Sequence, residues 1–433
     1  MKDHRLWMKR RELLIYIAIF LYSVALFLKR VNLPINQNLL NKTMMFGTLI
    51  ALANIIFDRK MNPKQWIFTA VIGLLLLVDS LPTGNHELFY LFIIIWSCRN
   101  LEKRALMKYI FGIVLIMTLL TGYLTCLGIV KNDVFILNET RVRYGLGYNV
   151  WSILPFQFLA LCFMYLYLTQ KRVYIWKIGV MIIMAFVIGE VTDTSSSSML
   201  TALGLLCLYA TQFVHIKKWN KLKWLMWVPE ILAGFSIMAT FLYMRGNSFF
   251  VRLNAVLHYR FLYQAIGFND FGIGLFANPE YETSTDPETY FGIDNNYINL
   301  LIAWGIVALI VILFVYSYLI KYCIRMENIK LLIIIMIFVF TAIMWSRLLV
   351  LIEAEYLVCF SEAFKDKRLR DKKEYLFHKE KYHYSNEIDK IVLHEFERVK
   401  NLMKKRAFPF DNKKMFEYIN VYYQIKKEQD EIF

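Results

Sequence analysis

The chain has 433 residues, 58% of them hydrophobic, and its mean hydropathy is +0.44. This composition excludes a set of water-soluble domains. The 50 Lys and Arg residues against 34 Asp and Glu give a formal net charge of +16, which in a soluble protein would indicate nucleic-acid binding.

Apolar runs recur along the first 364 residues, and a transmembrane helix needs roughly 20 mostly apolar residues. The apolar cores lie at 13–28, 43–57, 65–78, 87–98, 109–130, 151–168, 174–191, 199–214, 224–243, 297–320, 329–345 and 348–364. They predict an all-α polytopic membrane protein with about twelve transmembrane helices. The range is ten to twelve, because some cores are short and only Ser346 and Arg347 separate the last two.

The basic residues alternate along these predicted spans as cytoplasmic and outer loops would. With the N-terminus inside, the inner connections carry 22 Lys and Arg, the longer outer connections carry ten, and 18 follow residue 364. This distribution predicts that both termini are cytoplasmic, and it explains most of the positive charge without nucleic acid.

Residues 365–433 differ in composition from the predicted membrane domain, 1–364. They hold 18 Lys and Arg and 13 Asp and Glu, with apolar residues at helical spacing. This pattern predicts a charged, helical cytoplasmic tail. An alternative is a membrane-surface or partner-binding segment, because Lys404, Lys405 and Arg406 precede Phe408 and Phe410.

Two predicted outer loops, 131–150 and 245–296, are long, and each has three basic residues. These are Lys131, Arg141 and Arg143 in the first loop and Arg245, Arg252 and Arg260 in the second. Arginine binds phosphate oxygens through two parallel hydrogen bonds, so these arginines are candidates for a phosphate site. The alternative is that each reaches the lipid headgroups or pairs with a loop carboxylate such as Glu139 or Asp270.

The second loop contains further candidates. If 249–265 is one helix, Arg252 and Arg260 lie about 80° apart around its axis and border one groove. His258 between them is either a base, a phosphate ligand or an ordinary hydrogen-bonding residue. Glu190 and Asp193 flank the outer end of the seventh predicted span.

Glycine and polar residues mark the end of the second loop. Phe271-Gly272-Ile273-Gly274 is followed about twenty residues later by Asp294-Asn295-Asn296-Tyr297, where the tenth span begins. The glycines allow a tight backbone, and Asp294 with the asparagines is predicted to cap the helix start. Six cysteines lie in or next to spans, with no pair in an outer loop and no metal-ligand spacing, so neither a disulfide framework nor a metal site is predicted.

Two patterns give the chain a resemblance to the Wzy-type polysaccharide polymerases and the related O-antigen ligases, polytopic enzymes of the glycosyltransferase C fold group. They are Arg143-x-Gly145-x-Gly147-Tyr148-Asn149 and Phe271-Gly272-x-Gly274…Asp294-Asn295-x-Tyr297…Leu301…Gly305. The resemblance covers 1–364. The chain departs from the family at 192–198, which lacks the cation of a frequent Ser-Arg pair, and Arg260 precedes Gly272 by one residue too many.

The resemblance implies polymerisation of oligosaccharide repeat units carried on undecaprenyl pyrophosphate, for capsule, exopolysaccharide or O-antigen, at the outer face of a bacterial plasma membrane. It implies pyrophosphate binding by Arg143, Arg252 and Arg260, with Arg141 and Arg245 as further candidates. Asp294, or else Glu139 or His258, would act at the acceptor hydroxyl. Gly272, Gly274, Asn295, Tyr297 and Asn149 would be loop-motif residues.

The same resemblance implies no cofactor and no metal, and a flippase and a chain-length regulator as partners in the bilayer. Two other functions fit much of the sequence. One is a ligase that moves the finished glycan to a different acceptor, and the other is a flippase for the same lipid-linked glycan. A flippase favours internal repeats and charges along a central pathway, and the sequence has no clear repeat.

Overall fold

The computed structural model describes residues 2–58, 61, 63–138, 141–169, 172–214, 219–257, 259–281 and 291–343. The predicted twelfth span near 348–364 and the predicted tail at 365–433 lie outside these residues. Glu139 and His258 also lie outside them. The boundary between the two predicted domains stays a prediction.

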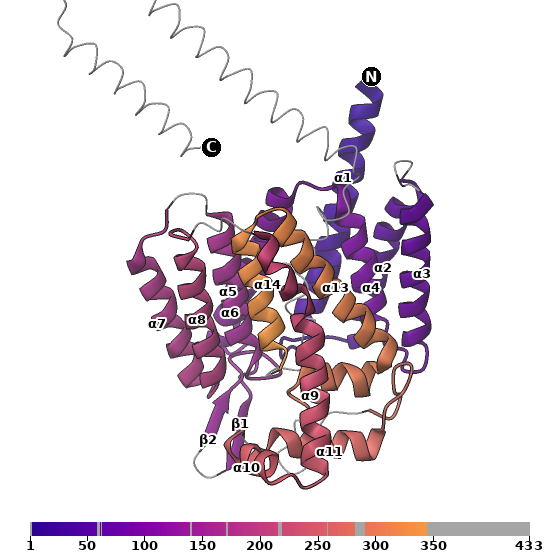
Figure 1. Ribbon diagram of the computed structural model, residues 1–433. Helices are drawn as coiled ribbons and strands as arrows, with labels where there is room; N and C mark the ends of the chain where they lie inside the picture. Colours follow the sequence, from indigo (N-terminus) through magenta and orange to yellow (C-terminus); the bar gives the residue numbers. More distant parts are fainter. Residues whose placement is uncertain are drawn as a thin grey trace, which may run out of the picture. The chain divides into compact units, whose positions relative to one another are not determined.

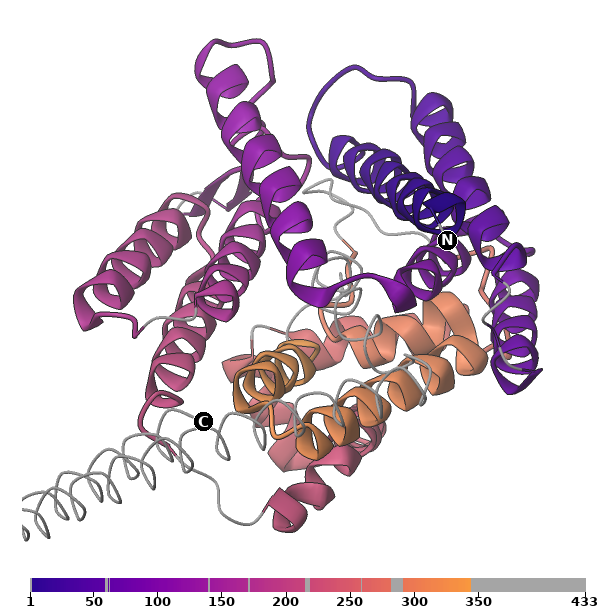
Figure 2. The ribbon, with the colours of Figure 1, turned by 90° about the horizontal axis from the view of Figure 1, so that it is seen from above.

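Apolar helices running across one bundle form most of the described chain (Figure 1). They are α1 (Lys2–Leu28), α2 (Gln37–Ile56), α3 (Pro63–Ser80), α4 (Glu87–Ser97), η1 (Cys98–Asn100), α5 (Lys103–Cys126), α6 (Ile153–Leu168), α7 (Ile175–Val191), α8 (Ser195–Ala210), η2 (Trp219–Trp227), α9 (Val228–Met244), α10 (Ser248–Val256), α11 (Arg260–Phe271), α12 (Asn296–Asn299), η3 (Leu300–Trp304), α13 (Gly305–Arg325) and α14 (Ile329–Thr341). Seen from above, α1 to α4 form one group and α6 to α8 another, and α13 and α14 lie near both (Figure 2).

Five helical stretches are long and apolar enough to cross a membrane: Arg11–Leu28, Gln37–Ile56, Arg104–Cys126, Lys221–Met244 and Asn296–Arg325. Shorter apolar helices pack beside them, including Ile153–Leu168 and Ser195–Ala210. The chain is therefore a mostly helical membrane protein, as predicted. The total of about twelve spans stays a prediction.

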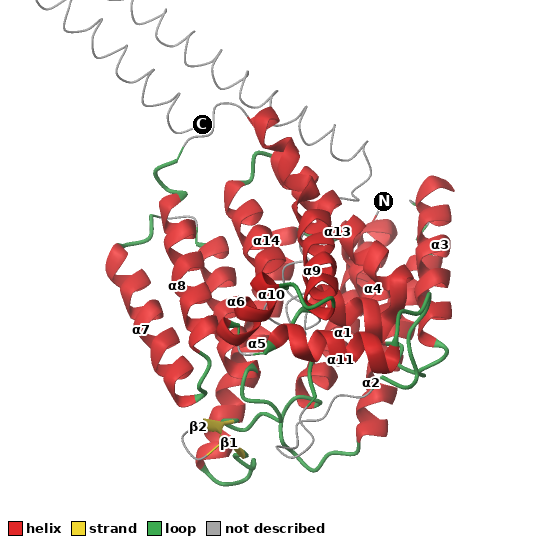
Figure 3. Ribbon diagram, turned by 60° about the horizontal axis from the view of Figure 1, so that its bottom comes forward, coloured by secondary structure: helices red, strands yellow, loops and turns green. Residues whose placement is uncertain are grey.

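One β-hairpin departs from the predicted all-α fold. Strands β1 (Val134–Asn138) and β2 (Arg141–Tyr144) pair antiparallel, with Phe135 opposite Arg143. The hairpin lies with α10 and α11 at the end of the bundle opposite the N-terminus (Figure 1), and its two strands are the yellow arrows in Figure 3. Its sequence is rich in β-branched and aromatic residues, which favour strands.

The hairpin is fixed to the bundle through the first motif. The backbone N–H of Asn32 donates to the carbonyl of Gly147 at 2.8 Å, and the side chain of Asn149 donates to the carbonyl of Lys29 at 3.1 Å. Gly147 has a φ of 88°, and a Cβ there would lie 2.1 Å from Oγ1 of Thr125. Glycine suits this position because its φ is left-handed and the side chains of Thr121, Thr125 and Val130 leave little room for a Cβ.

Residues 249–265 do not form one helix. Helix α10 ends at Val256, and α11 begins at Arg260 after Tyr259, which has a left-handed φ of 64°. The buried side chain of Asn254 accepts a hydrogen bond from the N–H of Leu262 at 3.2 Å, which satisfies a donor in the first turn of α11. The 80° separation of Arg252 and Arg260 therefore does not apply.

The glycines of the second motif bring the segment after α11 against the start of α13. The N–H groups of Ile306 and Val307 donate to the carbonyls of Gly274 and Leu275 at 3.0 and 3.1 Å. Gly305 has a φ of 79°, and a Cβ there would lie 2.6 Å from the carbonyl oxygen of Phe276. The segment thus supplies acceptors that α13 lacks at its N-terminus.

At the opposite end of the bundle, Asp58 forms a buried ion pair with Arg99. Arg11 approaches the other oxygen of Asp58 at 3.4 Å and donates to the carbonyl of Asn54 at 2.6 Å. A buried carboxylate with two guanidinium groups around it joins α1, α2 and η1.

We expect Gly305→Ala to destabilise the protein by about 1–3 kcal/mol, because alanine is strained at a positive φ and its Cβ meets the backbone of Phe276. Gly234→Ala in α9 is the matched control, since no atom lies within 4 Å of its Cβ position. Thermal unfolding of both variants in neutral detergent tests this. Equal melting temperatures would contradict it.

Candidate functional site

Two of the predicted arginines form ion pairs with carboxylates. Nε of Arg143, on β2, lies 2.9 Å from Oδ2 of Asp193, in the turn between α7 and α8. Nε of Arg260, the first residue of α11, lies 3.4 Å from Oδ2 of Asp294, which precedes α12. Each pair therefore joins elements that are separated in the sequence.

An aromatic surface holds the guanidinium of Arg143. Its central carbon lies 4.7 Å from the centroid of the Trp151 ring, a cation–π contact. Phe135, the register partner of Arg143, packs its ring edge-to-face against Trp151 with centroids 4.9 Å apart. The hairpin and the segment before α6 thus orient Arg143 together.

Asp193 has an unusual backbone conformation. It follows α7 with a left-handed φ of 48°, and the next N–H, of Thr194, donates to the carbonyl of Gly189 at 2.8 Å. Aspartate tolerates this conformation better than most residues other than glycine and asparagine. The turn directs the carboxylate of Asp193 toward Arg143.

The two ion pairs influence each other electrostatically. Although the Asp294 side chain is 41% exposed, burial of its carboxylate among protein atoms is the largest influence on its pKa, which it raises. The positive charges of Arg260 and then Arg143 act in the opposite direction. The charge of Arg143 thus reaches Asp294, and Arg143, Asp193, Arg260 and Asp294 are called the four-charge cluster below.

Both arginines of the four-charge cluster use Nε in their ion pairs. The terminal nitrogens of Arg143 and Arg260 have no hydrogen-bond partner among the residues that the structure describes. Each guanidinium therefore presents two donor groups beside a carboxylate. This arrangement can bind an oxyanion, and Asp294 can accept a proton next to it.

The predicted helix cap is formed by one of the asparagines, Asn295, and not by Asp294. Oδ1 of Asn295 accepts the N–H groups of Tyr297 at 3.0 Å and Ile298 at 3.3 Å, and its Nδ2 donates to Oγ of Ser236 at 2.9 Å. The neighbouring carboxylate of Asp294 instead approaches Arg260.

Other motif residues hold the helices and turns that carry the cluster. The buried hydroxyl of Tyr297 donates to the carbonyl of Val339 at 2.9 Å, which fixes α12 to α14. Gly272 ends α11 with a φ of 69°, and the carbonyl of Gly274 accepts from α13. Together with Asn149 in the hairpin connection, these residues position the charged side chains and do not belong to the cluster.

The remaining predicted residues lie elsewhere. Arg252 on α10 and Arg245 after α9 are exposed, and neither forms an ion pair within the described ranges. Arg141 is the first residue of β2. Sequence reasoning missed Trp151, and it noted Asp193 only as a flanking residue. Asp193 is the single acidic residue in a segment of threonines and serines, and this was the sequence feature that could have indicated its role.

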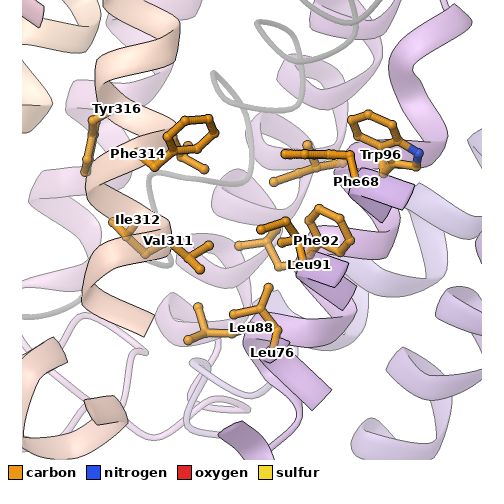
Figure 4. Close-up of a pocket in the computed structure, with 13 residues that line it drawn as sticks. Phe68, Leu76, Leu88, Leu91, Phe92, Trp96, Val311, Ile312, Phe314 and Tyr316 are labelled. Carbon is orange, nitrogen blue, oxygen red and sulfur yellow. The ribbon is translucent and has the colours of Figure 1, made fainter. Parts of the chain in front are cut away.

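An apolar slot between α3, α4 and α13 is separate from the cluster (Figure 4). Phe68, Leu88, Trp96, Val311 and Tyr316 are among the residues that line it. None of the four charged residues reaches it. The slot suits hydrocarbon and offers no group for charge chemistry. In the part of the chain that the structure describes, no three His, Cys, Asp or Glu side chains gather as metal ligands.

No family model, no curated protein and no solved structure matches the chain. The resemblance to the polymerases and ligases therefore rests on the two motifs and the pattern of spans.

We expect the purified protein in neutral detergent to bind inorganic pyrophosphate, and Arg143→Gln and Arg260→Gln each to weaken binding roughly tenfold or more. A hydrogen bond to a charged group contributes about 1.5–3 kcal/mol, which corresponds to such a factor. Lys131→Gln is the matched control, because Lys131 lies in the same loop but is 78% exposed and pairs with Asp133. Isothermal titration calorimetry measures the affinities, and equal values in all four proteins would contradict the site.

Proposed function

We propose that the chain is a glycosyltransferase that polymerises oligosaccharide repeat units carried on undecaprenyl pyrophosphate. The observation that supports this most is that Asp294, from the second motif, pairs with Arg260 and also lies within the electrostatic influence of Arg143, from the first motif. A transfer from a lipid pyrophosphate requires cations for the departing group and a base for the acceptor hydroxyl. The four-charge cluster contains both.

In the proposed reaction, the bond between the anomeric carbon of the donor sugar and the pyrophosphate oxygen breaks. The acceptor hydroxyl oxygen forms the new bond to that carbon, and its proton passes to Asp294. Undecaprenyl pyrophosphate leaves with the electron pair of the broken bond, and Arg143 and Arg260 stabilise its charge. No metal ion needs to take part in this scheme.

Substrate binding and the basicity of Asp294 are coupled in this scheme. Arg260 pairs with Asp294 when the site is empty and lowers its pKa. A pyrophosphate that binds Arg260 adds negative charge next to the carboxylate and weakens its pairing with the arginine. Both changes raise the proton affinity of Asp294. The carboxylate thus becomes a stronger base when the donor is present.

The proposal places the end of the bundle with the hairpin at the outer face of a bacterial plasma membrane, with both termini in the cytoplasm. The apolar helices agree with a membrane location. The orientation rests on the distribution of Lys and Arg in the sequence. Partners would be a flippase that delivers the lipid-linked units and a regulator of chain length.

We expect Arg143→Gln and Arg260→Gln to lower the turnover rate by about 10²–10³, because each removes a donor to the leaving group. Asp294→Asn should leave binding of the lipid-linked donor largely intact and remove elongation. The measurement incubates purified protein with lipid-linked repeat units and follows the ladder of products, with Lys131→Gln as control.

The same assay separates the alternatives. A single transfer to a different acceptor would indicate a ligase. Movement of the lipid across vesicles without bond formation would indicate a flippase. Normal ladders from both arginine variants would contradict the assigned site.

Elongation should also depend on pH through Asp294. The base acts when deprotonated, so the rate should fall as the pH is lowered through a pKa above about 3.9, the ordinary value for aspartate. Arg143 lowers this pKa, so the residual rate of Arg143→Gln should fall at a higher pH than that of the wild type. A rate independent of pH down to about 4 would exclude Asp294 as the base.

A further inference from the structure

The η2 segment presents two different faces. It has three residues per turn, so residues three apart form rows along it. Trp219, Leu222 and Leu225 form one row and pack against the hydrophobic core. Lys221, Trp224 and Trp227 form another row, which is exposed, and the two tryptophans are 60% and 56% exposed. Such helices rarely exceed four residues, and this one has nine.

The end of α13 adds positive charge at the same end of the bundle as η2. Helix α13 contacts η2, and Ser317 of α13 donates a hydrogen bond to Glu230 in the first turn of α9. Helix α13 and the η2–α9 segment run antiparallel, and this bond fixes how they align along their length. The residues of α13 after Ser317, including Lys321 and Arg325, therefore lie toward η2, which precedes α9. Both are exposed, as is Lys223.

Four cations therefore gather at this end: Lys221, Lys223, Lys321 and Arg325. No carboxylate pairs with any of them in the described chain, although Glu327 follows closely in sequence. The surface lies before the N-terminus of α9, whereas Asn295, next to Asp294 of the four-charge cluster, contacts Ser236 in the middle of that helix. It is independent of the proposed reaction.

We propose that these four cations with Trp224 and Trp227, the η2 surface, bind the headgroups of anionic phospholipids. Tryptophan prefers the boundary between headgroups and hydrocarbon, with its ring in the apolar layer and its N–H in the polar one. Lysine and arginine beside it attract phosphate. The preference of cytoplasmic loops for Lys and Arg explains cations in this region. It does not explain exposed tryptophans in the same row.

Fluorescence quenching of the full-length protein in vesicles tests this surface. The vesicles contain brominated phosphatidylglycerol, which is anionic, or brominated phosphatidylcholine, which is neutral overall. We expect the anionic lipid to quench more strongly at low salt, and the difference to shrink at high salt as the charges are screened.

Two variants and a control make the test specific. Replacement of Lys221, Lys223, Lys321 and Arg325 by Gln should remove the preference for the anionic lipid. Trp224→Phe with Trp227→Phe should remove the signal that reports it. Trp176→Phe with Lys177→Gln changes another exposed tryptophan next to a lysine and should keep the preference.

Equal quenching by both lipids would overturn the proposal. So would a preference that survives in the charge variant or in the Trp224 and Trp227 variant. Chromatography and circular dichroism before reconstitution confirm that each variant is folded. If the tryptophan variant does not fold, the charge variant alone decides.

Discussion

The hydrogen bonds from Ile306 and Val307 to the carbonyls of Gly274 and Leu275 determine how the second half of the chain is arranged. A helix that begins inside an apolar bundle leaves N–H groups that no water can satisfy. Here the segment after α11 supplies the acceptors, and Gly305 allows the two backbones to approach. The end of α11 is thereby joined to the start of α13.

This constraint brings Arg260 and Asp294 together. Arg260 begins α11, before the joined segment, and Asp294 lies between that segment and α13, so the backbone contact helps to fix their separation. Arg143 belongs to a different element, the β-hairpin. Hydrogen bonds of Gly147 and Asn149 fix this hairpin to the end of α1. A charged cluster built this way needs the glycines of both motifs for its geometry, although no glycine contacts the charges.

The sequence predicted the helices because hydrocarbon length and hydropathy act locally. The sequence-based predictions failed where a residue distant in the sequence determines the local structure. The apolar spacing continues through 249–265, but Asn254 folds back to satisfy the start of a second helix. Asp294 and Asn295 are both good capping residues by type, and Ser236 on α9 and Arg260 on α11 select which one caps. Asp193, fifty residues from Arg143, could be assigned only by tertiary packing.

The pairing of each arginine with a carboxylate is compatible with anion binding. An isolated guanidinium near hydrocarbon is costly, and a carboxylate partner reduces that cost while the site is empty. Partly exposed ion pairs of this kind contribute only about 0–1 kcal/mol, so a ligand can displace them. A pyrophosphate carries more than one negative charge and several acceptor oxygens, and it can engage the terminal nitrogens that Asp193 and Asp294 leave unused. In the proposed function, the four-charge cluster would therefore be stable when empty and would favour a multiply charged oxyanion over a carboxylate.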